Sequence, residues 1–149
     1  MAIKTYKKGS KTRVATNFLV SEFCCKGNDC CVAAKIDTAL VELLQNIRNH
    51  FGVPVVINSA YRCEKHNKAV GGAKNSYHTK GMAADIVATG VKPLEIARYA
   101  ESIGVKGIGL YDDFVHVDTR DVKSFWYSQR EEKRYTFFDE NPIKKWQQA

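Results

Sequence analysis

Apolar residues recur at every third or fourth position between residues 36 and 51. This spacing places them on one face of an α-helix, because each helical turn holds about 3.6 residues. Asp37 stands near the start of the run as a candidate N-cap, while Gly52 and Pro54 mark its end. The pattern therefore predicts a helix with one buried face, formed by Ile36, Leu40, Leu43, Leu44, Ile47 and Phe51.

Shorter apolar runs bounded by turn residues predict β-strands at residues 53–57, 82–87, 107–111 and 114–117. Pro93 fits the first turn of a second helix, and Gly104 closes it. The apolar face of this helix would contain Leu94, Ala97, Ala100 and Ile103. The mixture predicts the α+β class, with a small antiparallel or mixed sheet covered by helices.

The length of 149 residues and an apolar content of 44% predict a single domain over residues 1–149. We expect its core over about residues 17–123, after a polar, irregular N-terminal arm at 1–16. A C-terminal tail at 124–149 would pack over this core as a covering. The polar segment 58–81 predicts a long loop with a short helix near 64–68, and such loops often carry function.

The formal net charge of +7 favours polyanionic partners, among them the anionic polymers of a bacterial cell wall. A solvated basic surface without a partner is the plainer alternative. Binding to nucleic acid would rest on charge alone, because no recognition motif accompanies it, so we expect no nucleic-acid partner. We expect a monomer.

No apolar run approaches the roughly 18 residues of a membrane-spanning helix, so the sequence predicts no membrane span. The N-terminus is basic but no apolar run follows it, which predicts that there is no secretory signal. We therefore expect synthesis in the cytoplasm.

Four of the five cysteines form the segment Cys-Cys-Lys-Gly-Asn-Asp-Cys-Cys at 24–31, and the fifth is Cys63. Reduced thiols on a turn are the default for a cytoplasmic protein. One or two disulfides across the turn at Lys26–Asp29 are an alternative. A structural metal is another, although the spacing differs from paired C-x-x-C motifs and adjacent cysteines rarely both bind one ion well. An odd count leaves at least one thiol over.

Two histidines and one aspartate carry the clearest chemistry: His78, Asp85 and His116. Two imidazoles and a carboxylate are a common ligand set for catalytic zinc, which keeps a fourth position open. Such an ion activates water and polarises a carbonyl. His50 and His66 have no comparable companions, and we interpret them as structural.

The predicted elements allow the three residues to meet. His78 lies in the loop, and Asp85 follows it on the strand after the sharp turn that Gly81 permits. In the last strand His116 and Asp118 share a face with Phe114, while Val115 and Val117 occupy the other. Asp118 is then placed to orient a ligand, as metal-bound histidines require.

The segment 58–85 resembles the superfamily of zinc D-Ala-D-Ala carboxypeptidases and L-alanyl-D-glutamate endopeptidases. The matching features are Ser59-x-Tyr61-Arg62, Asn67, Gly71-Gly72 and Ser76-x-His78-x-x-Gly81-x-Ala83-x-Asp85, followed by Gly107-Ile-Gly-Leu-Tyr111 and Phe114-Val-His-Val-Asp118. The resemblance covers about residues 17–123. It implies the fold of these peptidases and of the hedgehog signalling domain, with one zinc ion in a cleft.

The resemblance also implies site roles. His78, Asp85 and His116 would be the metal ligands, and Arg62 would bind the substrate carbonyl or carboxylate and steady the oxyanion; a loop salt bridge is the alternative for Arg62. The general base would be Asp113, where many members carry the longer Glu. Regular strand phase favours Asp112 instead, a turn or bulge at Asp113 would remove that conflict, and Asp118 is a third candidate. Ser76, Tyr61 and Asp118 would shape the cleft.

The function implied is hydrolysis of an amide bond in the stem peptide of peptidoglycan, as a carboxypeptidase or an endopeptidase. The small size and absent signal resemble bacteriophage and prophage lysins, which reach the cell wall through a holin-made pore. A non-catalytic zinc-binding module, like the hedgehog domain, is the alternative. Arg62 and an acidic residue at 113 argue against it, because a binding module needs neither.

Overall fold

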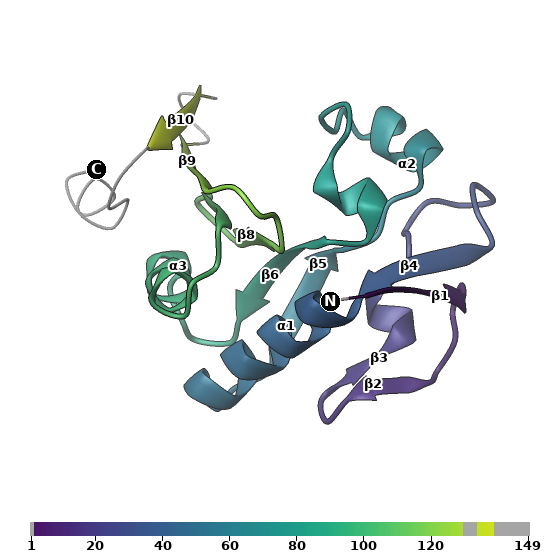
Figure 1. Ribbon diagram of the computed structural model, residues 1–149, viewed down its shortest axis with the longest axis horizontal. Helices are drawn as coiled ribbons and strands as arrows, with labels where there is room; N and C mark the ends of the chain where they lie inside the picture. Colours follow the sequence, from purple (N-terminus) through teal and green to yellow (C-terminus); the bar gives the residue numbers. More distant parts are fainter. Residues whose placement is uncertain (1, 130–133, 139–149) are drawn as a thin grey trace.

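The computed structural model describes residues 2–129 and 134–138, and these form an α+β fold around a mixed sheet (Figure 1). The six strands of this sheet lie in the order β10-β9-β7-β8-β6-β5, and all neighbours are antiparallel except β7 and β9. Their bounds are Val55–Ser59 (β5), Ala83–Ala88 (β6), Gly107–Leu110 (β7), Val115–Asp118 (β8), Ser124–Gln129 (β9) and Arg134–Phe138 (β10). The predicted class and sheet type are confirmed.

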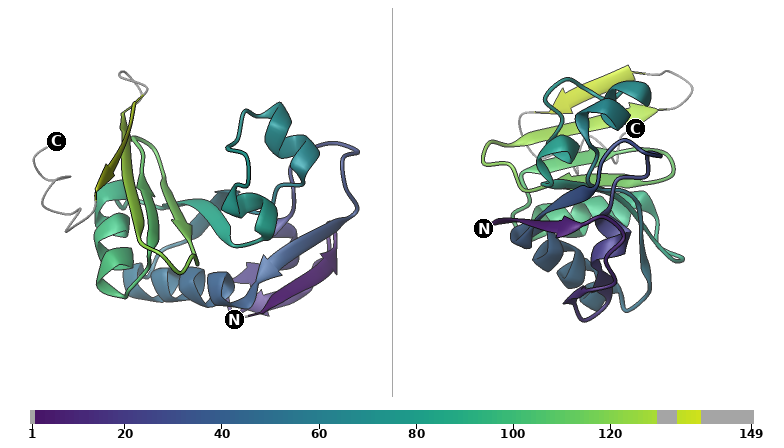
Figure 2. Two further views of the ribbon diagram at one scale, coloured as in Figure 1. Left: turned by 45° about the horizontal axis from the view of Figure 1, so that its top comes forward. Right: turned by 90° about the vertical axis from the view of Figure 1, so that its right-hand side faces the viewer.

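Two helices, α1 (Thr38–Phe51) and α3 (Pro93–Ser102), cover one face of the sheet (Figure 2). The N-cap prediction for α1 is confirmed, because the carboxylate of Asp37 accepts a hydrogen bond from the N–H of Ala39 at 3.0 Å. Gly52 ends the helix in the left-handed region, with φ of 66°. Ile36 belongs to the preceding strand, so the predicted helix begins two residues later than its first apolar position.

The core lies between these helices and the sheet. It includes Leu40, Leu44 and Ile47 of α1, Ile96, Ala97 and Ala100 of α3, and Ile86, Ile108, Val115 and Val117 of the sheet. The predicted face of the second helix is therefore correct in its centre, but it is wrong at Ile103, which is the C-cap of α3 and 42% exposed.

The N-terminal segment is more regular than the sequence predicts. Strand β1 (Ile3–Lys7) pairs antiparallel with β4 (Ala33–Asp37), and β2 (Arg13–Ala15) pairs with β3 (Phe18–Leu19). A short 3₁₀-helix, η1 (Val20–Phe23), follows. The prediction of an irregular arm is wrong here, because backbone pairing with β4 orders a strand whose side chains are mostly exposed.

The C-terminal segment extends the sheet instead of covering it, as far as the structure describes it. In β9, Phe125 is buried in the core, and Tyr127 packs against that core. Trp126 and Ser128 alternate with them and are also buried. Successive side chains of a strand point to opposite faces, so both faces of β9 carry buried residues. The covering predicted for residues 139–149 lies outside the described residues.

The long segment between β5 and β6 lies on the opposite side of β6 from α1 (Figure 2). It contains the predicted short helix, α2 (Glu64–Ala69), and a 3₁₀-helix, η2 (Tyr77–Lys80). None of the helices in the described part of the chain has the length and apolar character needed to cross a membrane.

Candidate active site

Strand pairing sets the floor of the site. Asp85 of β6 lies directly opposite His116 of β8, which lies opposite Gly109 of β7, and Gly109 is paired in turn with Trp126 of β9. These residues share the sheet face that is not covered by α1 and α3, because Val115 and Val117 alternate with His116 and point into the core. The predicted strand phase of His116 is confirmed.

Two glycines of β7 leave room on this face. A Cβ at Gly109 would overlap the indole ring of Trp126, and a Cβ at Gly107 would overlap the carboxylate of Asp118. The side chains of Trp126 and Asp118 therefore lie over β7, and a side chain in place of either glycine would displace them.

The 3₁₀-helix η2 delivers His78 to the same place. The Ser76 hydroxyl caps this helix by accepting a hydrogen bond from the N–H of His78 at 3.2 Å. Gly81 ends it with φ of 77°, and a Cβ there would overlap the backbone carbonyl of Lys35. The sharp turn predicted at Gly81 is confirmed, since only glycine fits both the conformation and the space.

Hydrogen bonds on the far side of each imidazole fix its tautomer. His78 Nδ1 donates to the carbonyl oxygen of Ala60 at 2.7 Å, which leaves the lone pair on Nε2. His116 Nε2 donates to Asp118 Oδ2 at 2.7 Å, which leaves the lone pair on Nδ1. The predicted orienting contact of Asp118 is therefore present.

The nitrogens that carry these lone pairs meet at one carboxylate oxygen. Asp85 Oδ1 lies 3.2 Å from His78 Nε2 and 3.1 Å from His116 Nδ1. One ligand atom from each of the three residues lies within 4.8 Å of the others. With neutral imidazoles all three atoms are acceptors, so their convergence requires a cation or added protons between them.

Hydrogen bonds lower the pKa of two buried carboxylates, Asp85 in this cluster and Asp118 beside it. Burial raises the pKa of Asp85, but hydrogen bonds with His116 and then His78 outweigh it and hold that pKa well below its usual range. Burial likewise opposes ionisation of Asp118, whereas hydrogen bonds with His116 and then Arg120 lower its pKa to about 2. Arg120 contacts both oxygens of Asp118, at 2.8 Å and 2.6 Å. Asp118 is thus ionised at neutral pH behind His116.

Arg62 is held by three partners. Its Nε donates to Ser59 Oγ at 3.0 Å, its Nη1 donates to Asn67 Oδ1 at 3.0 Å, and its Nη2 contacts Asp85 Oδ2 at 3.4 Å. A Cβ at Gly72 would overlap the Asn67 amide, so this glycine permits the arrangement. Arg62 thus forms a salt bridge, but its partner Asp85 lies on strand β6 and not on the loop.

These groups line a cavity of about 650 Å³. Its wall includes aromatic residues that the sequence did not single out as functional, namely Tyr77, Tyr111, Phe114 and Trp126. Trp126 Nε1 donates to the hydroxyl of Tyr111 at 2.9 Å, and the rings of Tyr111 and Phe114 stack with centroids 4.3 Å apart. Arg120 was also missed, although its position two residues after Asp118 was a usable signal.

The candidate bases Asp112 and Asp113 lie at the exposed tip of a hairpin beside the cavity. The N–H of Tyr111 donates to the carbonyl oxygen of Phe114 at 3.1 Å and closes this turn between β7 and β8. The turn that removes the strand-phase conflict for Asp113 is therefore present. Tyr111 and Phe114 on either side of the two aspartates line the cavity.

Comparison with known proteins gives one family and several relatives. The family model for Peptidase M15 matches residues 16–118. The chain is 34% identical over 101 residues to the probable peptidoglycan L,D-endopeptidase MepK of Haemophilus influenzae, which covers 61% of this chain and 54% of that protein. It is 37% identical over 93 residues to the peptidoglycan L,D-endopeptidase MepK of Escherichia coli K12, which covers 56% and 51%. The chain spans about half the length of these curated relatives.

Proposed function

Because the chain belongs to the Peptidase M15 family, we propose that it is a zinc-dependent peptidase that hydrolyses an amide bond in the stem peptides of peptidoglycan. The observation that carries this proposal is the convergence of His78 Nε2, Asp85 Oδ1 and His116 Nδ1 on one point beside a cavity. Both relatives are named peptidoglycan L,D-endopeptidases, which supports peptidoglycan as the substrate class.

The three donors fit a zinc ion. Tetrahedral ligands about 2.0–2.1 Å from zinc lie roughly 3.3 Å apart. The contacts of 3.2 Å and 3.1 Å between Asp85 Oδ1 and the two imidazoles are close to that spacing. When bound, zinc supplies a Lewis acid that polarises a carbonyl and acidifies a water molecule.

The remaining residues keep the ligands in place. Ala60 and Asp118 hold the two imidazoles with their lone pairs turned inward, and Arg120 keeps Asp118 ionised. Asp118 is occupied by these contacts and is shielded from solvent, so it serves as an orienting group and not as the base.

Arg62 is proposed to donate to the oxyanion that develops on the scissile carbonyl. Arg62 lines the cavity, and the contacts to Ser59 and Asn67 fix the plane of its guanidinium before substrate arrives. Asp113 is proposed to accept a proton from the attacking water and to return it to the leaving amine. Asp112 is the alternative base on the same turn.

We favour an endopeptidase over a carboxypeptidase, because both relatives are named L,D-endopeptidases. The aromatic wall formed by Tyr111, Phe114 and Trp126 would contact the substrate beside the scissile bond. The net charge of +7 suits action at an anionic cell wall.

Digestion of purified peptidoglycan by the zinc-loaded protein tests the proposal, with products identified by mass spectrometry. New stem-peptide fragments from the wild type but not from Asp113→Ala would support a peptidase with Asp113 as its base, and the fragments would identify the bond. Asp112→Ala is the matched control. Fragments lost only in the control would move the base to Asp112. Zinc binding without fragments from any protein would favour a non-catalytic zinc-binding module.

A further inference from the structure

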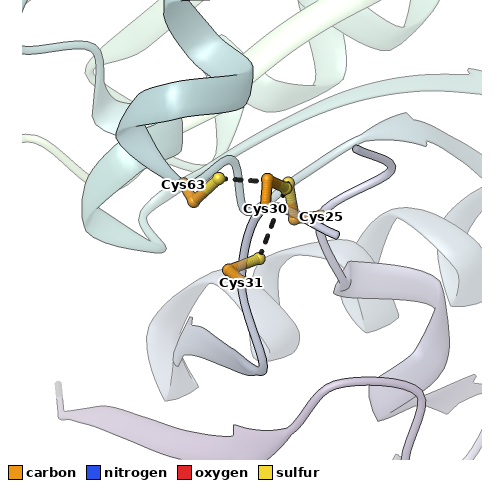
Figure 3. Close-up of side chains that lie close together, drawn as sticks. All are labelled: Cys25, Cys30, Cys31 and Cys63. Atoms are coloured by element: carbon orange, nitrogen blue, oxygen red, sulfur yellow. Dashed lines mark hydrogen bonds between the residues drawn. The ribbon is translucent and has the colours of Figure 1, made fainter. Parts of the chain in front are cut away.

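A second cluster of potential ligands lies away from the histidine site. The side chains of Cys25, Cys30, Cys31 and Cys63 converge, the first three from the loop before β4 and the last from the start of α2 (Figure 3). Their Sγ atoms all lie within 4.8 Å of one another. The shortest separations are 3.6 Å for Cys25–Cys30, 3.8 Å for Cys25–Cys63 and 3.8 Å for Cys30–Cys31.

We propose that these four cysteines form a structural zinc site. Zinc–sulfur bonds of about 2.3 Å place tetrahedral sulfur ligands about 3.8 Å apart, which is close to the separations in this cluster. All five cysteines of the chain lie within the described residues and are free thiols. Metal binding would deprotonate these thiols, and a divalent cation would offset the repulsion among thiolates this close together.

The ligand set points to one ion with no open position. Four sulfur donors in a tetrahedron favour zinc or iron–sulfur chemistry. An iron–sulfur cluster uses its cysteines on different metal atoms and needs them further apart, whereas these sulfurs fit a single ion. Cys25 and Cys63 are buried, and all four coordination positions would be filled by protein, so the role is structural.

The local structure meets the objection that adjacent cysteines rarely share an ion. The Sγ atoms of Cys30 and Cys31 lie on the same side of the loop, 3.8 Å apart. Gly27 makes room for the turn, because a Cβ there would lie 2.6 Å from Cys30 Sγ. Lys8 Nζ donates to the carbonyl oxygen of Gly27 at 2.7 Å, which places a positive charge on the cysteine loop.

Cys24 is the cysteine left over. Its Sγ donates to the carbonyl oxygen of Val20 at 3.3 Å and accepts a hydrogen bond from the N–H of Gly9 at 3.3 Å. It packs with the hydrophobic core and lies outside the cluster. The odd cysteine count is thus explained as four ligands and one core residue, and Cys24 provides a matched control.

The site would fasten the catalytic arginine. Cys63 directly follows Arg62 and caps α2 by accepting a hydrogen bond from the N–H of His66 at 3.4 Å. The same helix carries Asn67, which holds the Arg62 guanidinium. A metal bound by Cys63 and the loop at 25–31 would therefore fix the backbone at Arg62. Asn67 holds the guanidinium, so the backbone and the side chain of Arg62 would both be held in place.

Cobalt substitution of the full chain tests this inference without relying on activity. We expect wild type purified under reducing conditions to bind two metal ions. Its cobalt form should show thiolate-to-cobalt charge-transfer absorption in the near ultraviolet, which imidazole and carboxylate ligands do not produce. His78→Ala should lose one equivalent of metal and keep this absorption. Cys25→Ser and Cys63→Ser should each lower this absorption, because one thiolate ligand is lost, while Cys24→Ser leaves it unchanged.

The wild-type spectrum alone can overturn the site, so the result does not depend on whether a variant folds. Absence of charge-transfer absorption in the cobalt-loaded wild type, with no protection of the four cluster thiols from a thiol reagent by added metal, would contradict metal binding. An intact mass lower by two hydrogens for each bond formed, in protein purified without reductant and lacking metal at the cysteines, would show disulfides instead. Iron as the resident metal would overturn the assignment to zinc. None of these outcomes depends on peptidase activity.

Discussion

At the residue scale, Asp85 connects the two histidines of the site to Arg62. One of its oxygens faces the lone pairs of His78 and His116, and the other faces the Arg62 guanidinium. A carboxylate in this position joins the metal-binding side of the site to the group proposed to stabilise the oxyanion. The charge of the ligand cluster therefore acts directly on the Arg62 guanidinium. The three contacts of Arg62 hold it in one orientation.

Arg62→Lys should separate positioning from charge. Lysine keeps the positive charge but has no planar fork, so it cannot contact Ser59, Asn67 and Asp85 together. We expect kcat/KM on peptidoglycan fragments to fall roughly 10²–10³-fold, in the range found when an oxyanion donor is removed. Metal content should stay at the wild-type value. Arg13→Lys, at an exposed position of β2, is the control and should be unaffected.

Unchanged kcat/KM in Arg62→Lys would show that its guanidinium geometry has no part in the reaction. A parallel loss of metal would instead show that Arg62 acts by supporting Asp85.

At the element scale, the paired register of β6, β8, β7 and β9 lines up Asp85, His116, Gly109 and Trp126. The sequence predicted much of this, because a period of two in β8 assigns His116 and the valines to opposite faces. The helix at 38–51 was also predictable from periodicity, because its apolar residues recur at helical spacing along nearly its whole length.

Elements whose order depends on distant partners were not predictable. Strand β1 has mostly exposed side chains and no buried face to reveal it. Strand β9 joins the sheet beside β7 in parallel, a pairing that hydrophobic alternation alone cannot specify. Cys63 meets the cysteines of 25–31 only because the fold brings α2 over that loop. In each case the local pattern is compatible with several partners.

Gly109→Ala should destabilise the fold by roughly 1–3 kcal/mol, as overpacking of a filled site does. The added Cβ would overlap the Trp126 indole, which lies across β7 and bonds to Tyr111. Denaturant unfolding would measure the free energy of unfolding for Gly109→Ala in wild-type and Trp126→Ala backgrounds. Removal of the indole makes room, so the cost of the alanine should shrink in the second background.

An equal cost in both backgrounds would contradict this account and place the effect of Gly109→Ala in the backbone of β7. Trp126→Ala alone gives the cost of losing the ring, which the comparison subtracts.

At the scale of the whole molecule, one short segment links the two ligand clusters. Between β5 and α2, the Ala60 carbonyl holds His78, Arg62 contacts Asp85, and Cys63 joins the thiol cluster. Tyr61 of the same segment donates from its N–H to the carbonyl oxygen of Phe23 at 3.0 Å, next to the cysteine loop. A structural change at either cluster would therefore be transmitted to the other through residues 60–63.

The buried anion at Asp118 should make the stability of the molecule depend on acid. Hydrogen bonds with His116 and Arg120 outweigh burial and hold the pKa of Asp118 at about 2 in the folded protein. In an unfolded chain the pKa of Asp is about 3.9. The folded state therefore binds this proton less readily, and the carboxylate contributes roughly 2 kcal/mol of stability above about pH 4, which is lost as the pH falls towards about 2.

Denaturant unfolding of the metal-free protein at several pH values between about 5 and 2 would measure this loss, with a chelator present to exclude metal release. Asp118→Asn keeps the shape of the side chain but has no proton to gain. The variant should be less stable near neutral pH, and its free energy of unfolding should fall less steeply with acid than that of wild type. Asp121→Asn, at an exposed position nearby, should follow the wild-type curve. Parallel curves for Asp118→Asn and wild type would mean that Asp118 ionises equally in both states, which its contacts with Arg120 and His116 argue against.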